Sequence, residues 1–329
     1  MRIHQLVIAT AFLCSTFAIG ADAPSYGDWL KLSGERIDAK SFPAVSSETP
    51  RVVKTNVLKN VRWMLGEEPP RASVPQPSLD AARRKIRFGS GLSGDLLFPL
   101  NAERGGGKFP LVVMLDGTNA SSHAALARAG IVTFAFEQIG KGVRTEEAKT
   151  FYAHFPRWSL LGKRVAETRE ALDAAATIPS VDTNKVWLLG FDTAATTALH
   201  TAALDSRVRG VIVIGGFAPT RPSLANRGVP TAATSQLQFP LVPRLGAFVG
   251  NEDRIPYDYR ELVAVIAPRP VLLFAPSNDT QVDANDLARA YAPMTHVRYQ
   301  VLDLSNGFDA KVQRAVIDEL KRATGLSAP

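Results

Sequence analysis

Apolar residues along this chain gather in short runs separated by longer amphipathic segments. The runs span residues 110–115, 131–136, 186–189, 210–215, 271–275 and 297–302. A short apolar run bounded by turn residues is typical of a strand that is buried on both faces. The intervening segments carry apolar residues at helical spacing, and strands that alternate with helices form a mostly parallel sheet covered on both faces. The pattern therefore predicts the α/β class, with a doubly wound sheet.

Two further elements frame this alternation. Residues 85–99 predict two short strands joined by a Gly-rich turn, and no Gly-Lys-Ser/Thr follows that would make the turn a phosphate loop. Residues 310–324 predict a closing amphipathic helix, with Val312, Val316 and Leu320 on one face.

The N-terminus has the pattern of a secretory signal peptide. Residues 1–23 combine a basic start, an apolar run over 6–18 and small residues after it. Cleavage after Gly20 and cleavage after Ala23 both fit. The apolar run is shorter than the ~20 residues that span a bilayer, so we expect a secreted or periplasmic protein with no membrane attachment after cleavage. The only cysteine, Cys14, lies in this segment, which excludes disulfides and thiol catalysis from the mature chain.

The mature chain is predicted to divide into an N-terminal extension over residues 24–84, with a helix within 52–66, and one domain over residues 85–329. The net charge is +7 and the pI about 9.6. The basic residues are scattered rather than clustered, which favours a solvated basic surface and not a nucleic-acid partner. The oligomeric state does not follow from the sequence.

Three segments carry a family resemblance, namely residues 158–173, residues 255–270 and residues 305–309. In order and spacing they resemble the dienelactone hydrolase-like and acetyl xylan esterase-like branch of the α/β-hydrolase superfamily, with glucuronoyl esterases nearby. The resemblance implies an α/β-hydrolase fold from about residue 85 to the C-terminus. It also implies where an active site would lie.

The resemblance places the nucleophile elbow at residues 190–194, which read Gly-Phe-Asp-Thr-Ala where the family has Gly-x-Ser-x-Gly. The elbow is a strained turn that presents its central residue to substrate. That residue is Asp192, which stands where the family has its nucleophilic serine. The positions matching the two backbone donors to an oxyanion are Thr193 and Gly117.

The other catalytic positions differ from the family as well. Asn306 stands where the resemblance places the catalytic histidine, and an amide cannot act as a general base. Asp279 matches the acid of the triad, although it could equally form a turn or cap a helix. Asp192, Asp279 and Asn306 are thus the candidate catalytic residues.

Three more residues are pocket candidates by the same resemblance. Asp116 lies beside the first oxyanion donor, where negative charge would raise the barrier to ester hydrolysis. Arg260 stands where a related pattern has histidine, and Glu137 where an aspartate often follows the strand. We predict no cofactor and no metal site, since two carboxylates hold a cation only with further oxygen ligands.

Two functions remain open. The leading hypothesis is a secreted α/β-hydrolase-fold protein without conventional Ser-His esterase activity, which binds a carbohydrate or another small ester-like ligand. The alternative is an active hydrolase of ester or related bonds that uses Asp192 as nucleophile, with His123 or His154 recruited as base. His200, inside the helix after the elbow, is expected to be packed.

Overall fold

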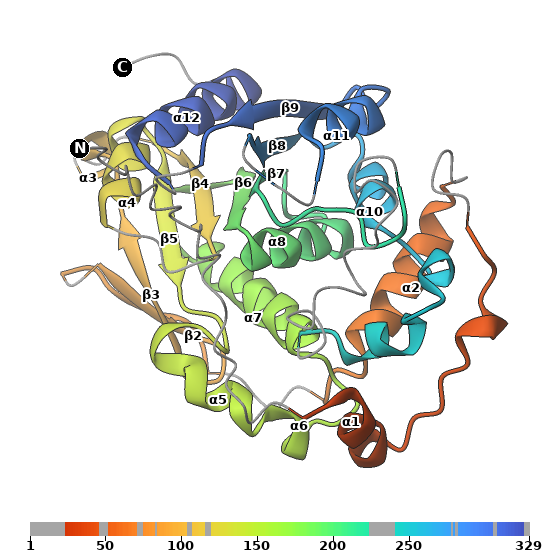
Figure 1. Cartoon of the computed structure of the whole chain (residues 1–329). Coiled ribbons are helices and arrows are strands. Elements are labelled where there is room, and N and C mark those ends of the chain that lie inside the picture. Colours follow the sequence, from red (N-terminus) through yellow and green to blue (C-terminus); the bar gives the residue numbers. More distant parts are fainter. Residues whose placement is uncertain are drawn as a thin grey trace, which may run out of the picture.

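The computed structural model describes residues 24–45, 52–70, 75–82, 84–103, 107–115, 120–223, 241–277, 279, 282–304 and 308–325. Its centre is a nine-stranded sheet in the order β1-β2-β3-β5-β4-β6-β7-β8-β9 (Figure 1). The first three strands pair antiparallel, as do β3 and β5, and all later pairs are parallel. The prediction of a mostly parallel α/β sheet is confirmed.

The strands follow the apolar runs of the sequence closely. Their bounds are β1 Ser78–Asp80, β2 Lys85–Phe88, β3 Leu92–Leu97, β4 Phe109–Met114, β5 Val132–Phe136, β6 Val181–Phe191, β7 Gly210–Ile214, β8 Val271–Pro276 and β9 Val297–Leu302. The central strands β4, β5 and β7 are buried over almost their whole length, as expected for strands with helices on both sides.

Helices cover both faces of this sheet. Their bounds are α1 Tyr26–Ser33, α2 Lys54–Leu65, α3 Leu100–Glu103, α4 Ala120–Arg128, α5 Thr145–Lys149, α6 Phe151–His154, α7 Leu160–Ala175, α8 Thr193–Leu204, α10 Tyr259–Ile266, α11 Ala284–Tyr291 and α12 Ala310–Thr324. The predicted closing helix coincides with α12, and the helix predicted within residues 52–66 is α2.

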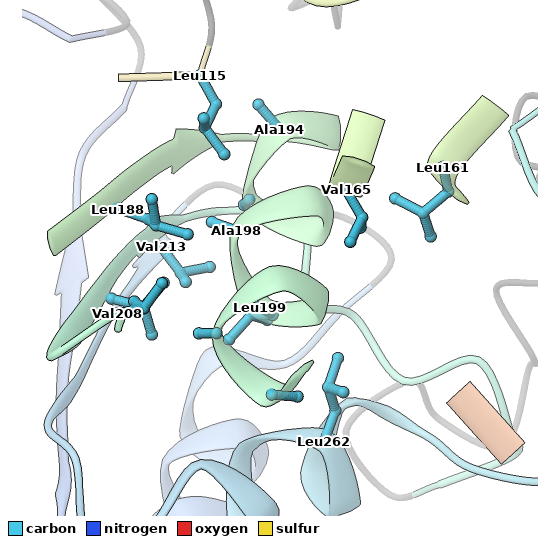
Figure 2. Packing of buried hydrophobic residues seen from close by; sticks show 14 of the residues in the cluster. Leu115, Leu161, Val165, Leu188, Ala194, Ala198, Leu199, Val208, Val213 and Leu262 are labelled. Carbon is cyan, nitrogen blue, oxygen red and sulfur yellow. The ribbon is translucent and has the colours of Figure 1, made fainter. Parts of the chain in front are cut away.

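Alternate residues of the strands build two separate cores. Leu188 and Val213 face α7, α8 and α10, where they meet Val165, Ala198 and Leu262 (Figure 2). The neighbouring residues of the same strands point to the opposite face and pack under α4 and α12; they include Trp187, Leu189 and Ile212. Because side chains alternate along a strand, the sheet fixes which helices lie beside the end of β6.

The N-terminal segment is bonded to two distant parts of the chain. The Trp29 indole N–H donates to the Pro156 carbonyl at 2.8 Å, and the Val45 N–H donates to the Asp253 carbonyl at 2.8 Å. The guanidinium of Arg244 pairs with the buried carboxylate of Glu35 and lies 5.1 Å from the centre of the Trp63 ring. These contacts fix residues 24–45 against Pro156 and against the short 3-10 helices η3, Pro243–Phe248, and η4, Glu252–Arg254.

Candidate functional site

Strand β6 ends in a sharp turn at Asp192, before helix α8 begins. The backbone there has φ 53° and ψ −119°, and among the described residues only Arg84 shares a positive φ without being glycine. A non-glycine residue in this conformation costs about 1–2 kcal/mol. Two backbone hydrogen bonds hold the turn: the Asp192 N–H donates to Ile214 at 2.9 Å, and the Ala195 N–H donates to the Asp192 carbonyl at 2.9 Å.

Two glycines leave room for this tight turn, Gly190 near the end of β6 and Gly216 just after β7. A Cβ at Gly190 would lie 2.3 Å from the Ala194 carbonyl oxygen, and a Cβ at Gly216, which follows β7, would lie 2.0 Å from the Asp192 carbonyl oxygen. Neither distance is possible for a real side chain. The elbow backbone therefore depends on both glycines.

A chain of hydroxyl groups braces the elbow from the side of α10. The Thr196 hydroxyl donates to the Gly216 carbonyl at 3.1 Å, and it lies 2.9 Å from the Tyr259 hydroxyl. Because the Thr196 proton points to Gly216, the Tyr259 hydroxyl must be the donor to Thr196. This chain connects α10, α8 and the loop that packs on Asp192.

The Asp192 carboxylate is mostly enclosed by protein. Burial raises its pKa above the ordinary value of 3.8, while Lys141, the adjacent Thr193 N–H and Arg164 act in the opposite direction. The carboxylate makes no capping hydrogen bond to α8. The Thr193 N–H, which would serve an oxyanion, thus already lies close to a negative charge supplied by the protein itself.

Two cations lie near Asp192, namely Arg164 on α7 and Lys141 in the loop that follows β5. Hydrogen bonds between α7 and this loop hold both in place. Arg164 on α7 is fully buried, and its Nε donates to the Ile139 carbonyl at 3.0 Å. Glu167, one helical turn later, accepts from the Ile139 N–H at 3.1 Å and from Arg144 Nη2 at 2.8 Å. These bonds fix the loop over residues 137–144, which carries Lys141, to helix α7.

Glu137, predicted as a pocket residue, belongs to the same loop. Its carboxylate accepts from the Val143 N–H at 3.1 Å, and its carbonyl accepts from Arg144 Nη1 at 3.0 Å. Adding a Cβ at Gly142 would place it 2.2 Å from the Glu137 carboxylate. The carboxylate therefore closes the turn over residues 142–144.

The other candidates are bonded to α11 or to the turn before it, or lie outside the described residues. Asp279 is exposed and accepts from the Val282 N–H at 3.2 Å, just before α11. Arg260 donates through Nε to the Ala290 carbonyl of α11 at 3.2 Å. Asp116, Asn306 and Gly117, the first oxyanion position, lie outside the described residues.

Each histidine of the described chain has a partner of its own. His123 Nδ1 lies 2.8 Å from the Thr133 hydroxyl of β5, which β4 separates from β6 in the sheet. His154 is exposed, with Nδ1 3.0 Å from the Thr150 carbonyl, and His296 Nε2 lies 3.1 Å from the Val263 carbonyl. Among the described residues, neither His123 nor His154 makes a hydrogen bond to Asp192. Apart from His4, the sequence holds only one other histidine, His200.

His200 is packed inside α8, as expected. Its Nδ1–H donates to the Thr196 carbonyl at 2.7 Å, and its Nε2 accepts from the Tyr257 hydroxyl at 2.7 Å. Burial lowers the pKa of His200 to about 4. The ring is therefore neutral near pH 7 and stabilises the contact between α8 and the start of α10.

The described residues contain no group of three His, Cys, Asp or Glu side chains placed to hold a metal ion. Within the same part of the chain, no helix is both long enough and apolar enough to cross a membrane.

A family model described as "Glucuronyl esterase, fungi" matches residues 90–303, which is more than half of the chain. The chain belongs to the glucuronyl esterase family. The resemblance to an α/β-hydrolase branch near the glucuronoyl esterases is thereby confirmed. No curated protein matches the sequence.

Solved structures of glucuronoyl esterases share the fold of this family member. A carbohydrate esterase family 15 glucuronoyl esterase from Caldicellulosiruptor kristjansonii is 17% identical, with a TM-score of 0.66 over 89% of this chain and 92% of that chain. The catalytic domain from Hypocrea jecorina is 18% identical, with a TM-score of 0.62 over 82% of this chain and 83% of that one. A 2,6-dihydroxy-pseudo-oxynicotine hydrolase is also similar, at 17% identity and a TM-score of 0.52, over 79% and 71% of the two chains.

Sequence reasoning missed two residues near Asp192 in this glucuronyl esterase-family protein. Lys141 follows the carboxyl end of β5, the edge of a parallel sheet where ligands bind, so its position in the sequence was a usable signal. Arg164 lies within an amphipathic helix, where arginine normally marks the solvent face. Only the three-dimensional structure shows it to be fully buried.

Replacing Asp192 by asparagine is expected to raise the melting temperature at pH 7. Burial raises the pKa of Asp192, so the ionised carboxylate destabilises the folded state. That cost is absent below the unfolded pKa near 3.8 and is complete above the folded pKa. The gain in the Asp192→Asn variant should therefore shrink as the pH falls toward 3.8. Thermal unfolding between pH 3 and 8 measures it.

The matched control is Asp318→Asn, which changes an exposed carboxylate on α12. It should give no comparable pH-dependent gain. A gain in Asp192→Asn that is absent at pH 7, or that grows on acidification, would contradict the account of the Asp192 carboxylate.

Proposed function

We propose that this glucuronyl esterase-family protein is secreted, binds a uronate-bearing carbohydrate at the elbow, and lacks Ser-His ester hydrolysis. One observation carries the proposal: a carboxylate occupies the apex of the elbow, and the hydrogen bonds of the histidines in the described chain go to groups other than Asp192. A serine nucleophile needs an imidazole to take its proton, and the released alcohol needs that proton back. Neither the nucleophile nor the base is present among the described residues.

The local charge also opposes the transition state of ester hydrolysis. An oxyanion is stabilised by donors that are aimed at empty space before the reaction. Here the Thr193 N–H already lies beside the Asp192 carboxylate and lowers its pKa. An oxyanion formed at this point would meet a fixed negative charge, which raises the barrier.

The same groups are suited to holding an acidic sugar. The Asp192 carboxylate can accept hydrogen bonds from hydroxyl groups, and Lys141, which acts on it electrostatically, can pair with a ligand carboxylate. The solved relatives are named as glucuronoyl esterases, and a glucuronoyl group is a uronic acid residue. We therefore propose glucuronic acid and its esters as the ligand class.

Binding of glucuronic acid and of methyl glucuronate, measured by isothermal titration calorimetry, tests this proposal. We expect Asp192→Ala to weaken binding of both ligands about tenfold, the effect of losing one or two charge-assisted hydrogen bonds. Lys141→Met should weaken binding of the acid more than that of the ester. Lys149→Met on α5, where Lys149 pairs with Glu146, is the control and should bind like wild type. Equal affinities in all four proteins, or no binding by wild type, would refute the proposal.

A second candidate function is alkyl transfer to Asp192. It is favoured by Lys141 and Arg164, which both support the ionised form of the carboxylate. An Asp192 oxygen would attack the alkyl carbon of an ester, the carbon–oxygen bond would break, and the substrate carboxylate would leave. The alkyl ester on Asp192 would persist, since no described histidine can activate water beside it. Incubation with methyl and benzyl esters followed by intact-mass measurement would reveal that adduct, and Asp192→Ala would not form it.

A further inference from the structure

A cavity of about 300 Å³ lies beside the loop over residues 137–144, which supplies Ile139 and Arg144 to its lining. Its other walls come from the β2–β3 turn, from helices α5 and α6, and from Lys163 and Glu170 of α7. Ile139 lines it, and Lys141, which acts on Asp192, is two residues further along the same loop. The cavity is at the lower end of the size range of small-molecule sites. We call it the side cavity.

The side cavity has an apolar wall that reaches solvent. Phe151 and Phe155 stand 5.4 Å apart between ring centres, and Leu92 lies on the opposite strand. Phe155 is 40% exposed, although it belongs to a cluster with the buried Trp158. An exposed aromatic ring at the mouth of a cavity offers a flat surface for packing.

Of the charged groups that line the side cavity, Arg144, Glu147 and Lys163 have partners within the protein. Arg144 bonds to Glu147 and to the buried Glu167, and Lys163 lies 3.6 Å from Glu167. Glu170 sits against the β2–β3 turn, so closely that a Cβ at Gly89 would lie 2.1 Å from its carboxylate. Two cations and two carboxylates line the cavity. Their charges balance, so nothing favours an ionic ligand.

Uncharged donors and acceptors complete the lining. Ser90, Thr150 and His154 are exposed residues at the cavity, and His154 uses only Nδ1 in its bond to the Thr150 carbonyl. A neutral sugar has C–H groups on the faces of its ring and hydroxyls around the edge. It would pack its face on Phe155 and direct its hydroxyls at these side chains.

We infer that the side cavity is an accessory site for one neutral sugar residue of a polysaccharide. The inference rests on the proposed carbohydrate-binding function for its ligand class, and adds a site that is separate from the elbow. A glycan held there would run across the loop over residues 137–144, with a uronate residue placed beside Lys141.

The test uses the ¹⁵N-labelled mature protein titrated with neutral gluco-, manno- and xylotetraose, and with trigalacturonate as an acidic comparison. At least one neutral tetrasaccharide is expected to shift the amide signals of Ser90, Thr150 and Phe155, and to bind more tightly there than trigalacturonate. Phe155→Ala should weaken that binding at least tenfold, and His154→Ala several-fold. Val301→Ala, an exposed side chain on β9 at the opposite end of the sheet from β2 and β3, should leave it unchanged.

The same titration on Asp192→Ala separates this inference from the proposed function. Shifts at the side cavity should persist in Asp192→Ala even if glucuronic acid does not bind at the elbow. The inference is overturned if no neutral tetrasaccharide shifts these signals, if Phe155→Ala and His154→Ala, both checked for folding by circular dichroism, bind like wild type, or if trigalacturonate binds more tightly than every neutral tetrasaccharide.

Discussion

Glu167→Ala is expected to lower the free energy of unfolding by about 3–5 kcal/mol, the usual effect of removing one partner of a buried ion pair. The Glu167 side chain is 0% exposed and accepts from the Ile139 N–H and from Arg144, with Lys163 at 3.6 Å. Alanine would leave the buried Ile139 N–H without an acceptor and would remove one of the two carboxylates that pair with the largely buried Arg144 guanidinium. Denaturation with urea at pH 7 measures the change.

The matched control is Glu147→Ala, because Glu147 pairs with the same Arg144 but is 52% exposed at its side chain. Exposed pairs contribute about 0–1 kcal/mol, so this variant should be nearly as stable as wild type. The Glu167→Ala variant should also bind ligand more weakly at the elbow, because Glu167 fixes the loop that carries Lys141. Similar stability losses in the two variants would show that burial does not control this network.

Gly216→Ala is expected to lower the free energy of unfolding by about 3 kcal/mol or more. Its Cβ would lie 2.0 Å from the Asp192 carbonyl oxygen, which belongs to the backbone and cannot rotate away. Alanine at φ +68° costs about 1–2 kcal/mol because of its backbone conformation. Overpacking against the Asp192 backbone costs about 1–3 kcal/mol more. The clash would also move Asp192, so ligand binding at the elbow should be lost.

Gly215→Ala is the control for the backbone conformation alone. Gly215 has φ +66°, and nothing lies within 4 Å of a Cβ placed there. This variant should lose only about 1–2 kcal/mol and keep its ligand binding. If the two alanine variants are equally stable, the close packing of Gly216 on Asp192 does not determine the shape of the elbow.

The central strands could be predicted from the sequence because a strand buried on both faces needs a continuous apolar run. The run predicted at residues 271–275 falls within β8, Val271–Pro276, and the run at 210–215 contains β7, Gly210–Ile214. The closing helix was equally clear, since Asp309 caps it and Val312, Val316 and Leu320 form its buried stripe. Strand β1 was missed, because its three residues are exposed and have no buried face to produce a pattern.

The candidate site was predictable only in part. The elbow could be located because its strand and helix have strong local patterns and its apex is a single residue. Asp279 and Glu137 make local hydrogen bonds of the kind that any turn-forming carboxylate can make. The sequence alone does not distinguish such a carboxylate from one that lines a pocket. Arg164 and Glu167 lie on the buried face of α7, where a sequence pattern leads the reader to expect apolar side chains.

The absence of Ser-His ester hydrolysis can be tested with the mature protein. The measurement is the hydrolysis of methyl and benzyl glucuronate and of short-chain aryl acetates. It should be measured for wild type, Asp192→Ala and Asp192→Ser. We expect all three to give the rate of buffer alone, because even a serine at the apex would have no imidazole to take its proton. Turnover by wild type that disappears in Asp192→Ala would contradict the account and make Asp192 a catalytic residue.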